Sequence, residues 1–204
     1  MLLDSLIIGG GVSGISCALV LGSAQQKNFA KDKKITIITH QKTSALQDAI
    51  FYNAYGIVPG TLGSELLHTS TAHLAESYPH ITQIQNEKVI KIEGTFPEFM
   101  VTTNKSTYKT ATVVIGIGST NTFDIEGLMN YVETHQKSLP IKNRIQLRNK
   151  DHKVAEGIYV IGTLAGWRSQ LAIAAGSGAA VATDLLTLWN EGEQTHAHDS
   201  IREK

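Results

Sequence analysis

The segment that decides the fold runs Leu6-Ile7-Ile8-Gly9-Gly10-Gly11-Val12-Ser13-Gly14, a short apolar strand that leads directly into a glycine loop. Residues 15–21 continue as an apolar segment compatible with a helix, and residues 35–39 form a second apolar strand candidate. The order strand, GxGxxG, helix, strand is the context in which such a loop marks a dinucleotide-binding unit. The pattern therefore predicts a dinucleotide site at the start of the chain, with a purely structural glycine turn as the alternative.

Each fingerprint glycine has its own predicted task. Gly9 permits the tight turn after the strand, Gly11 lets the backbone approach a pyrophosphate, and Gly14 lets the helix pack closely on the strand. The helix N-terminus, at Val12 and Ser13, would offer unpaired N–H groups and a partial positive charge to the phosphates.

The end of the second strand departs from the usual fingerprint. An Asp or Glu there normally holds the adenosine ribose, whereas this sequence has Thr39-His40. Both side chains can form a hydrogen bond with a ribose hydroxyl, but neither supplies a carboxylate. NAD specificity is therefore not indicated by this position.

The remaining pattern predicts one α/β domain over residues 1–190, followed by a polar tail over 191–204. We expect a Rossmann-like, three-layer fold with a parallel sheet and a small antiparallel β-meander over residues 88–110. Residues 119–156 read as a connector, with one short strand near 144–148 inside it. The other predicted elements are a helix over 65–76 after the turn Pro59-Gly60, strands over 88–93, 99–103, 107–110, 112–118 and 157–162, and a long helix over 169–189.

Composition excludes several classes of protein. The 204 residues contain 18 Lys and Arg against 18 Asp and Glu, which argues against nucleic acid or an anionic membrane as a partner. A single cysteine, Cys17, rules out an internal disulfide or a CxxC pair, and we expect it to be a buried apolar residue. The eight histidines show no metal-ligand spacing, so no metal is predicted. No membrane span or signal peptide is apparent, and a cytoplasmic location is the expectation.

Three separated segments resemble the thioredoxin-reductase-like, FAD-dependent pyridine nucleotide-disulphide oxidoreductases. Residues 7–14 resemble the FAD fingerprint, residues 112–119 the second glycine signature, and residues 157–180 the C-terminal flavin signature. Asn53 and Pro59-Gly60 are similar to the segment beneath the isoalloxazine ring. The signatures stand in the family's order across nearly the whole chain, so the resemblance implies an FAD-binding domain.

The family's second domain is not expected in this chain. In the family an inserted domain binds NADPH and carries a CxxC, whereas residues 119–156 are too few for a βαβ domain. No second strand–GxGxxG–helix occurs, because Gly176-Ser177-Gly178 lies inside a helical pattern. The family's disulphide chemistry is therefore not expected within these residues.

Two positions of the C-terminal signature also differ. The family's Gly-Asp, which holds the flavin ribityl chain, is Gly162-Thr163 here, and its Arg-Gln pair is Ser169-Gln170. The resemblance implies that Thr163 contacts the ribityl chain and that Gln170 and Leu171 present backbone N–H groups to the flavin. Thr163 brings no charge, so FAD affinity is expected to be weaker than in the family.

Taken together, the residues predicted to bind FAD are Gly9, Gly11, Val12, Ser13, Gly14, Thr39, His40, Asn53, Val89, Gly116, Gly118, Gly162, Thr163, Ser169, Gln170 and Leu171. Three aromatic residues, Trp167, Tyr52 and Tyr55, are candidates for a ring that covers the flavin, with ordinary packing as the alternative. No general acid or base stands out.

Three functions stay open from the sequence. The first is a flavoprotein oxidoreductase that takes electrons from a diffusing substrate, a nicotinamide cofactor or a partner protein. The second is a non-catalytic FAD module, such as a sensor or a subunit whose partner supplies the missing domain. The third is a relic that binds another nucleotide or none. A homodimer is compatible with each.

Overall fold

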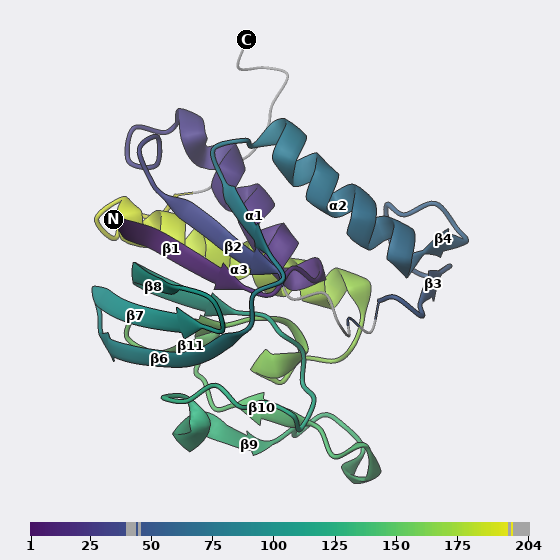
Figure 1. Cartoon of the computed structure of the whole chain (residues 1–204). Helices are drawn as coiled ribbons and strands as arrows, with labels where there is room; N and C mark the ends of the chain where they lie inside the picture. Colours follow the sequence, from purple (N-terminus) through teal and green to yellow (C-terminus); the bar gives the residue numbers. More distant parts are fainter. Residues whose placement is uncertain (40–43, 45, 196, 198–204) are drawn as a thin grey trace.

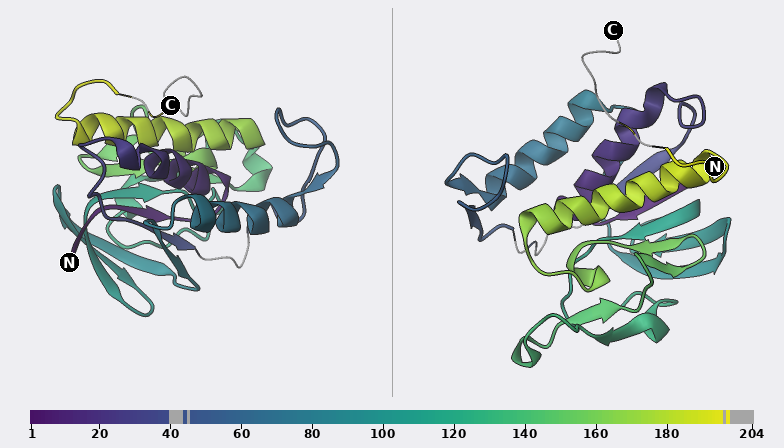
Figure 2. Two further views of the ribbon diagram at one scale, coloured as in Figure 1. Left: turned by 90° about the horizontal axis from the view of Figure 1, so that it is seen from above. Right: turned by 180° about the vertical axis from the view of Figure 1, so that it is seen from behind.

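The computed structural model describes residues 1–39, 44, 46–195 and 197. A twisted sheet forms the centre of the molecule, helices α1 (Val12–Ser23), α2 (Gly63–Ser77) and α3 (Leu171–Trp189) lie to one side, and a β-meander lies on the other (Figures 1 and 2). The predicted Rossmann-like α/β fold is confirmed.

The sheet is mainly parallel. Its strands run in the order β11 (Lys153–Ala155), β12 (Ile158–Val160), β8 (Thr107–Ile115), β1 (Leu2–Ile8), β2 (Ile35–Thr39) and β5 (Thr82–Gln85). All neighbours from β12 to β5 are parallel, and β11 joins β12 in the antiparallel direction. The predicted strand over 35–39 is confirmed residue for residue, while β5 and β11 escaped the sequence analysis.

The C-terminal halves of β1 and β8 are buried on both faces, which explains the apolar runs at residues 6–8 and 113–115. In β1, Leu6 and Ile8 pack with the meander residues, whereas Ile7 packs with the helices. The register places Ile7 opposite Ile37 and Val114, so one apolar row crosses three strands. Because the strands are packed on both faces, their carboxyl ends are held side by side at one edge of the sheet.

The two long helices α1 and α3 pack directly on each other. The Ser16 hydroxyl donates to the Ala175 carbonyl at 2.8 Å, and Val181, Ala182 and Leu185 of α3 join the core cluster on the helical side of the sheet. Among the described residues α3 is the one helix long and apolar enough, by length and composition, to cross a membrane. A third of this apolar stretch is buried within the fold, including Val181, Ala182 and Leu185.

The meander consists of β6 (Val89–Thr95), β7 (Glu98–Thr103) and the first part of β8. The prediction of two separate strands over 107–110 and 112–118 is wrong, because β8 is continuous from Thr107 to Ile115. Its first residues pair with β7 and the rest pair with β1, so one strand serves both layers. Local patterning cannot show that a strand changes partners.

The segment between β8 and β11 is not a featureless connector. It holds a hairpin of β9 (Val132–Thr134) and β10 (Ile145–Leu147), the second of which confirms the short strand predicted near 144–148. Another hairpin, β3 (Ile50–Phe51) with β4 (Thr61–Leu62), precedes α2. The described residues also include short 3-10 helices at η1 (Ala24–Gln26), η3 (Met129–Tyr131), η4 (Pro140–Lys142) and η5 (Gly162–Ala165). The described residues 119–152 contain no βαβ unit.

Candidate functional site

The candidate site is the edge at which the parallel strands end. Gly9 follows β1, Gly116 follows β8, and Gly162 follows β12. The N–H of Gly9 donates to the Ile38 carbonyl and that of Gly116 to the Ile8 carbonyl, both at 2.8 Å, so the loops leave the sheet side by side. Ligands of open α/β sheets bind at this carboxyl edge.

Two fingerprint glycines are required by packing. Gly9 has φ +115°, and a Cβ there would come within 2.4 Å of the Gly116 carbonyl oxygen. A Cβ on Gly14 would lie 1.8 Å from the Gly9 carbonyl oxygen. The tight turn at Gly9 and the close helix–strand contact at Gly14 are therefore confirmed as geometry.

Two other glycines of the predicted set face open space. A Cβ built on Gly11 or on Gly118 meets no atom within 4 Å. Gly11 is also the N-cap of α1, with an extended φ of −79° that any residue can adopt. Packing within the protein therefore gives no reason for a glycine at residue 11. A glycine there leaves the space beside the backbone open, as a ligand that approaches the backbone would require.

The N-terminus of α1 is suited to an anion. The first hydrogen bond of the helix runs from the Ile15 N–H to the Gly11 carbonyl, so the N–H groups of Val12, Ser13 and Gly14 have no acceptor within the helix. The first turn holds no acidic residue. Aligned peptide dipoles and these N–H groups favour a phosphate there.

Helix α3 begins well beyond the start of α1 along the same edge. A Cβ on Gly178 would lie 2.0 Å from the Ser13 carbonyl oxygen, so the third turn of α3 abuts the first turn of α1. The seven residues that precede Gly178 in the helix, from Leu171 to Ser177, extend α3 by about 10 Å past that contact. Two helix N-termini are thus placed at different points along one edge, an arrangement that suits an extended ligand.

The loop between β12 and α3 is fixed by one buried hydrogen bond. The Gly162 N–H donates to the Ser177 hydroxyl at 2.8 Å, and Ser177 is buried. Ser177 lies in the segment Gly176-Ser177-Gly178, which the sequence pattern places inside a helix, and it is not among the predicted site residues. Thr163 follows at once and is half-buried, so the bond positions the residue predicted to hold the ribityl chain.

Ser177→Ala is expected to lower the free energy of unfolding by about 1–3 kcal/mol, because the buried Gly162 N–H loses its acceptor. Urea unfolding monitored by circular dichroism measures the change. Thr183→Ala is a matched control, since the exposed Thr183 hydroxyl only donates to Ala180 within its own helix. Equal stability of Ser177→Ala and Thr183→Ala would contradict the role given to Ser177.

The start of α3 differs slightly from the prediction. The helix begins at Leu171 with Gln170 as its N-cap, and Ser169 and Gln170 are exposed. The N–H of Gln170 donates to the Arg168 carbonyl at 3.0 Å. The first N–H directed along the helix axis is therefore that of Leu171, and the flavin contact predicted for the Gln170 N–H would require that bond to break.

The adenosine end of the predicted site is less defined. Thr39 is buried, and its hydroxyl donates to the Ile84 carbonyl at 3.2 Å, which ties β2 to β5. His40 lies outside the described residues. Val89 is buried at the start of β6, close to this end of the sheet. The ribose contacts of Thr39 and His40 and the cofactor contact of Val89 stay predictions.

The aromatic candidates lie on different segments. Asn53, Tyr52 and Tyr55 belong to the exposed β3–β4 hairpin, which stands beyond the carboxyl edge next to the start of α2 (Figure 1). Trp167 lies just before α3, with Lys137 Nζ 4.3 Å from its ring centre and the His152 ring 6.0 Å away. None of these contacts joins Trp167 to the β3–β4 hairpin, so the structure does not bring the three rings into one lid.

The two titratable groups with raised pKa values on α1 and α3 do not offer a charged side chain at the carboxyl edge. Cys17 is fully buried in α1, as expected, and burial raises the pKa of its thiol, so it stays uncharged. Asp184, whose pKa is raised by burial and by Asp151, lies near the C-terminal end of α3, away from the strand ends. No cluster of potential metal ligands occurs among the described residues.

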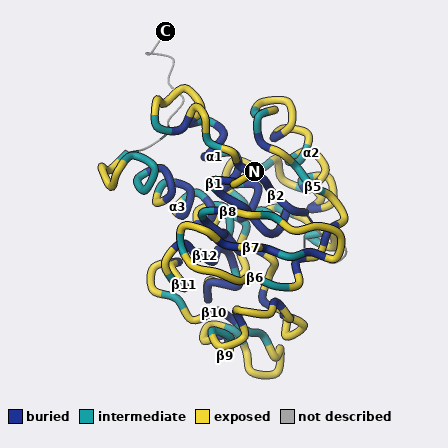
Figure 3. Tube along the Cα trace, turned by 60° about the vertical axis from the view of Figure 1, so that its left-hand side comes forward, coloured by how far each residue is buried: buried dark blue, intermediate teal, exposed yellow. Residues whose placement is uncertain are grey.

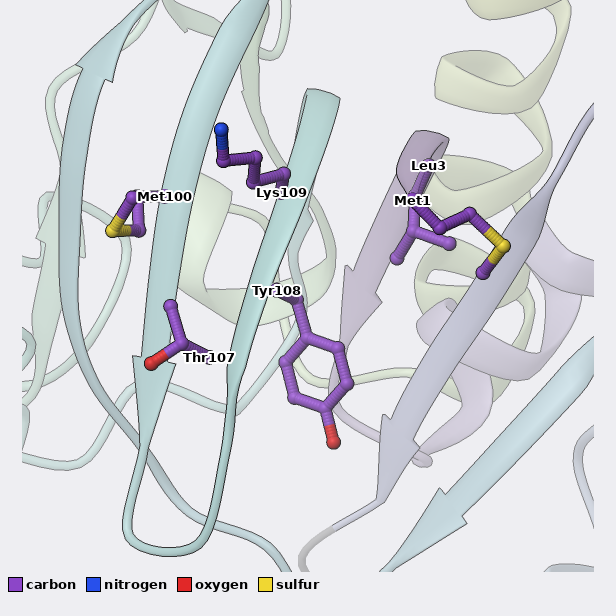
Figure 4. Close-up of a pocket in the computed structure, with 6 residues that line it drawn as sticks. All are labelled: Met1, Leu3, Met100, Thr107, Tyr108 and Lys109. Carbon is purple, nitrogen blue, oxygen red and sulfur yellow. The ribbon is translucent and has the colours of Figure 1, made fainter.

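A surface hollow lies elsewhere. Met1, Leu3, Met100, Thr107, Tyr108 and Lys109 line a space of about 400 Å³ between β1 and the meander (Figure 4). Leu2 pairs with Lys109, so the hollow lies at the amino end of β1, opposite the glycine loops. It has no N–H cradle and no glycine contact, and it is separate from the candidate site.

Comparison with known proteins identifies the family of the chain. The family model of the pyridine nucleotide-disulphide oxidoreductases matches residues 3–177. The chain belongs to this family. The match covers the glycine loop, β8 and the start of α3, and this family implies a flavin cofactor. No curated protein matches the sequence.

Solved structures of oxidoreductases share the fold. An oxidoreductase from Agrobacterium tumefaciens aligns with a TM-score of 0.73 at 15% identity, covering 95% of this chain and 100% of that one. A thioredoxin reductase from Gloeobacter violaceus gives 0.73 at 13% identity, with 98% of each chain covered. A ferredoxin-flavin thioredoxin reductase from Clostridium acetobutylicum gives 0.68 at 16% identity, covering 94% and 98%. At these identities the likeness shows the fold.

Proposed function

We propose that this chain is an FAD-binding oxidoreductase that takes its electrons from a diffusing donor or a partner protein and performs no disulphide exchange of its own. One observation carries the proposal: the open space above Gly11 lies at the N-terminus of α1, on a carboxyl edge that also holds the start of α3. The residues present fit an FAD molecule extended along that edge.

The chain's own groups would divide the binding among them. The N–H groups of Val12, Ser13 and Gly14 would bind the pyrophosphate, and the Thr163 hydroxyl would form a hydrogen bond with the ribityl chain. The N-terminus of α3 at Leu171 would stabilise negative charge on the carbonyl side of the ring. Bound FAD would supply the hydride- or electron-transfer chemistry.

The source of electrons is proposed to be outside these residues. The sequence has one cysteine, which is buried, so a dithiol pair within the chain is absent. The described residues between Gly118 and Gly157 form hairpins and 3-10 turns and hold no second dinucleotide fold. The name of the Clostridium neighbour, a ferredoxin-flavin thioredoxin reductase, supports a protein donor as one version of the proposal.

A non-catalytic FAD module is the second candidate. The groups with displaced pKa values among the described residues are Cys17, His80, Lys91, Tyr108, Lys153, Tyr159 and Asp184. None of them belongs to the predicted cofactor set, so no proton-transfer side chain stands out at the carboxyl edge. Such a site suits a protein that only holds FAD as well as one that passes electrons through it.

Anaerobic reduction of the FAD-loaded protein distinguishes the two. We expect the visible flavin absorption to bleach on addition of NADH, NADPH or a reduced electron-transfer protein, and to return with an acceptor. Bleaching by dithionite alone, with no turnover by any of the biological donors, would contradict the oxidoreductase and favour the module.

Thr163→Asp is expected to tighten FAD binding about tenfold, because a carboxylate accepts stronger hydrogen bonds from ribityl hydroxyls than a threonine hydroxyl does. Fluorescence titration of the apoprotein with FAD measures the dissociation constant. Thr183→Asp, at a half-buried position of α3 away from its N-terminus, controls for the added charge. Unchanged or weaker affinity in Thr163→Asp would count against the proposed ribityl contact.

A further inference from the structure

The β9–β10 hairpin contacts the loop after β8 and the loop after β12, which carry two of the three glycine signatures. The Ile145 N–H donates to the Ser119 carbonyl at 3.0 Å, and Arg144 forms an isolated bridge with Thr120, just after Gly118. On the other side, Lys137 Nζ lies 4.3 Å from the centre of the Trp167 ring, which precedes α3. The hairpin therefore stands beside the end of the site proposed for the flavin ring.

The hairpin tip carries positive charge without acidic neighbours in sequence. The loop between β9 and β10, residues 135–144, holds Lys137, Lys142 and Arg144 and no Asp or Glu, and two more cations, Arg148 and Lys150, follow β10. Within the described part of the chain, the lysines that form ion pairs are Lys33, Lys88, Lys91, Lys109 and Lys153, all outside the tip. The cations at the tip have no such partner there.

The same tip is apolar at its outer end. Leu139, which precedes η4, is 64% exposed, and Ile141 within η4 is 92% exposed. This turn projects from the molecule on the side where β1 ends (Figure 1), and the chain around β9 is largely exposed (Figure 3). Apolar residues surrounded by charged ones are the composition of a protein interface. A dinucleotide would use the cations for its phosphates but would gain little from the exposed Leu139 and Ile141, so a protein is favoured.

We propose that this surface binds an acidic electron-transfer protein that reduces the bound flavin. We name it the docking tip, and it comprises Lys137, Leu139, Ile141, Lys142, Arg144 and Arg168. The inference rests on the proposed function, because it assumes FAD at the carboxyl edge. Two encounters with a one-electron carrier deliver two electrons, each encounter oxidises one carrier, and solvent supplies the protons.

Electrostatic attraction between the docking tip and an acidic carrier would raise the encounter rate, and salt would lower it. The FAD-loaded protein is mixed with reduced acidic ferredoxin in a stopped-flow instrument, and the second-order rate of flavin bleaching is measured at low and high salt. We expect K142E/R144E to lower that rate about tenfold or more at low salt and to abolish most of its salt dependence. Ile141→Ser should lower the rate at both salt concentrations.

A matched control makes the same charge change elsewhere. Lys27 and Lys31 are exposed in the loop between α1 and β2, at the opposite, amino edge of the sheet. K27E/K31E is expected to keep the wild-type rate within about twofold. Each variant must also bind FAD and bleach with dithionite like the wild type, which shows that the site itself is intact.

Several outcomes would overturn the docking proposal while leaving the FAD site in place. The first is that ferredoxin reduces the flavin of wild type and of K142E/R144E at the same rate. The second is that dithionite reduces the flavin but ferredoxin does not. The third is that K142E/R144E is reduced more slowly by NADPH but not by ferredoxin. A dimer in sedimentation velocity that K142E/R144E dissociates would assign the tip to a second copy of the chain. Failure of the wild type to bind FAD would instead overturn the proposed function on which the inference rests.

Discussion

Gly178→Ala is expected to lower the free energy of unfolding by about 3 kcal/mol or more, although it adds a single methyl group. The new Cβ would lie 2.0 Å from the Ser13 carbonyl oxygen and 3.0 Å from the Cys17 nitrogen, both backbone atoms that no side-chain rotation can move. Helices α1 and α3 would have to separate, and core overpacking of this kind is strongly destabilising.

Gly176→Ala, two residues earlier in the same helix, supplies the control. A Cβ there meets no atom within 4 Å, and alanine has the higher helix propensity, so stability should rise by about 0.5–1 kcal/mol. In thermal unfolding, the melting temperatures of Gly178→Ala and Gly176→Ala should differ by about 10 °C for a chain of this size. Similar melting temperatures for the two variants would contradict the close contact of α1 with α3.

Gly11→Val is expected to abolish FAD binding while leaving most of the fold's stability. Its Cβ meets no atom of the protein within 4 Å, and its φ of −79° suits any residue, so the added side chain occupies only the space proposed for the pyrophosphate. The cost to the fold should be about 1 kcal/mol, for a poorer N-cap. An FAD titration and a urea unfolding curve of the same preparation measure the two effects.

Gly14→Val distinguishes this mechanism from general damage. Its Cβ would lie 1.8 Å from the Gly9 carbonyl oxygen, so that variant should lose the fold together with the cofactor. Stoichiometric FAD in folded Gly11→Val would refute the pyrophosphate position. Loss of folding in Gly11→Val to the same extent as in Gly14→Val would show that Gly11 serves packing after all.

The fold was largely accessible from the sequence because its central strands carry apolar runs, and all of these except the run at 35–39 lead into a glycine. The strands at residues 6–8, 35–39 and 157–162 could be predicted from such runs alone. The order of the three glycine signatures added the family, which the match to residues 3–177 confirms. Short edge strands such as β5 and β11 were missed, because half-buried residues in three- or four-residue strands leave no clear period.

Site residues could be predicted from the sequence where the backbone geometry admits only one residue type. Gly9 and Gly14 could be assigned from spacing, since only glycine fits a positive φ or a contact this close. Ser177 and Lys137 could not, because their roles depend on partners 15 and 30 residues away that only the folded chain brings near. The hydrogen bond from Thr39 to Ile84 was hidden for the same reason.

The most direct test is an equilibrium titration of the purified chain with FAD, followed by its visible absorption and protein-bound fluorescence. We expect one FAD per chain, with the absorption of a protein-bound oxidised flavin, and none in Gly11→Val. A colourless protein that binds no added FAD, or one that binds NAD in its place, would contradict the assignment of the carboxyl edge to a flavin.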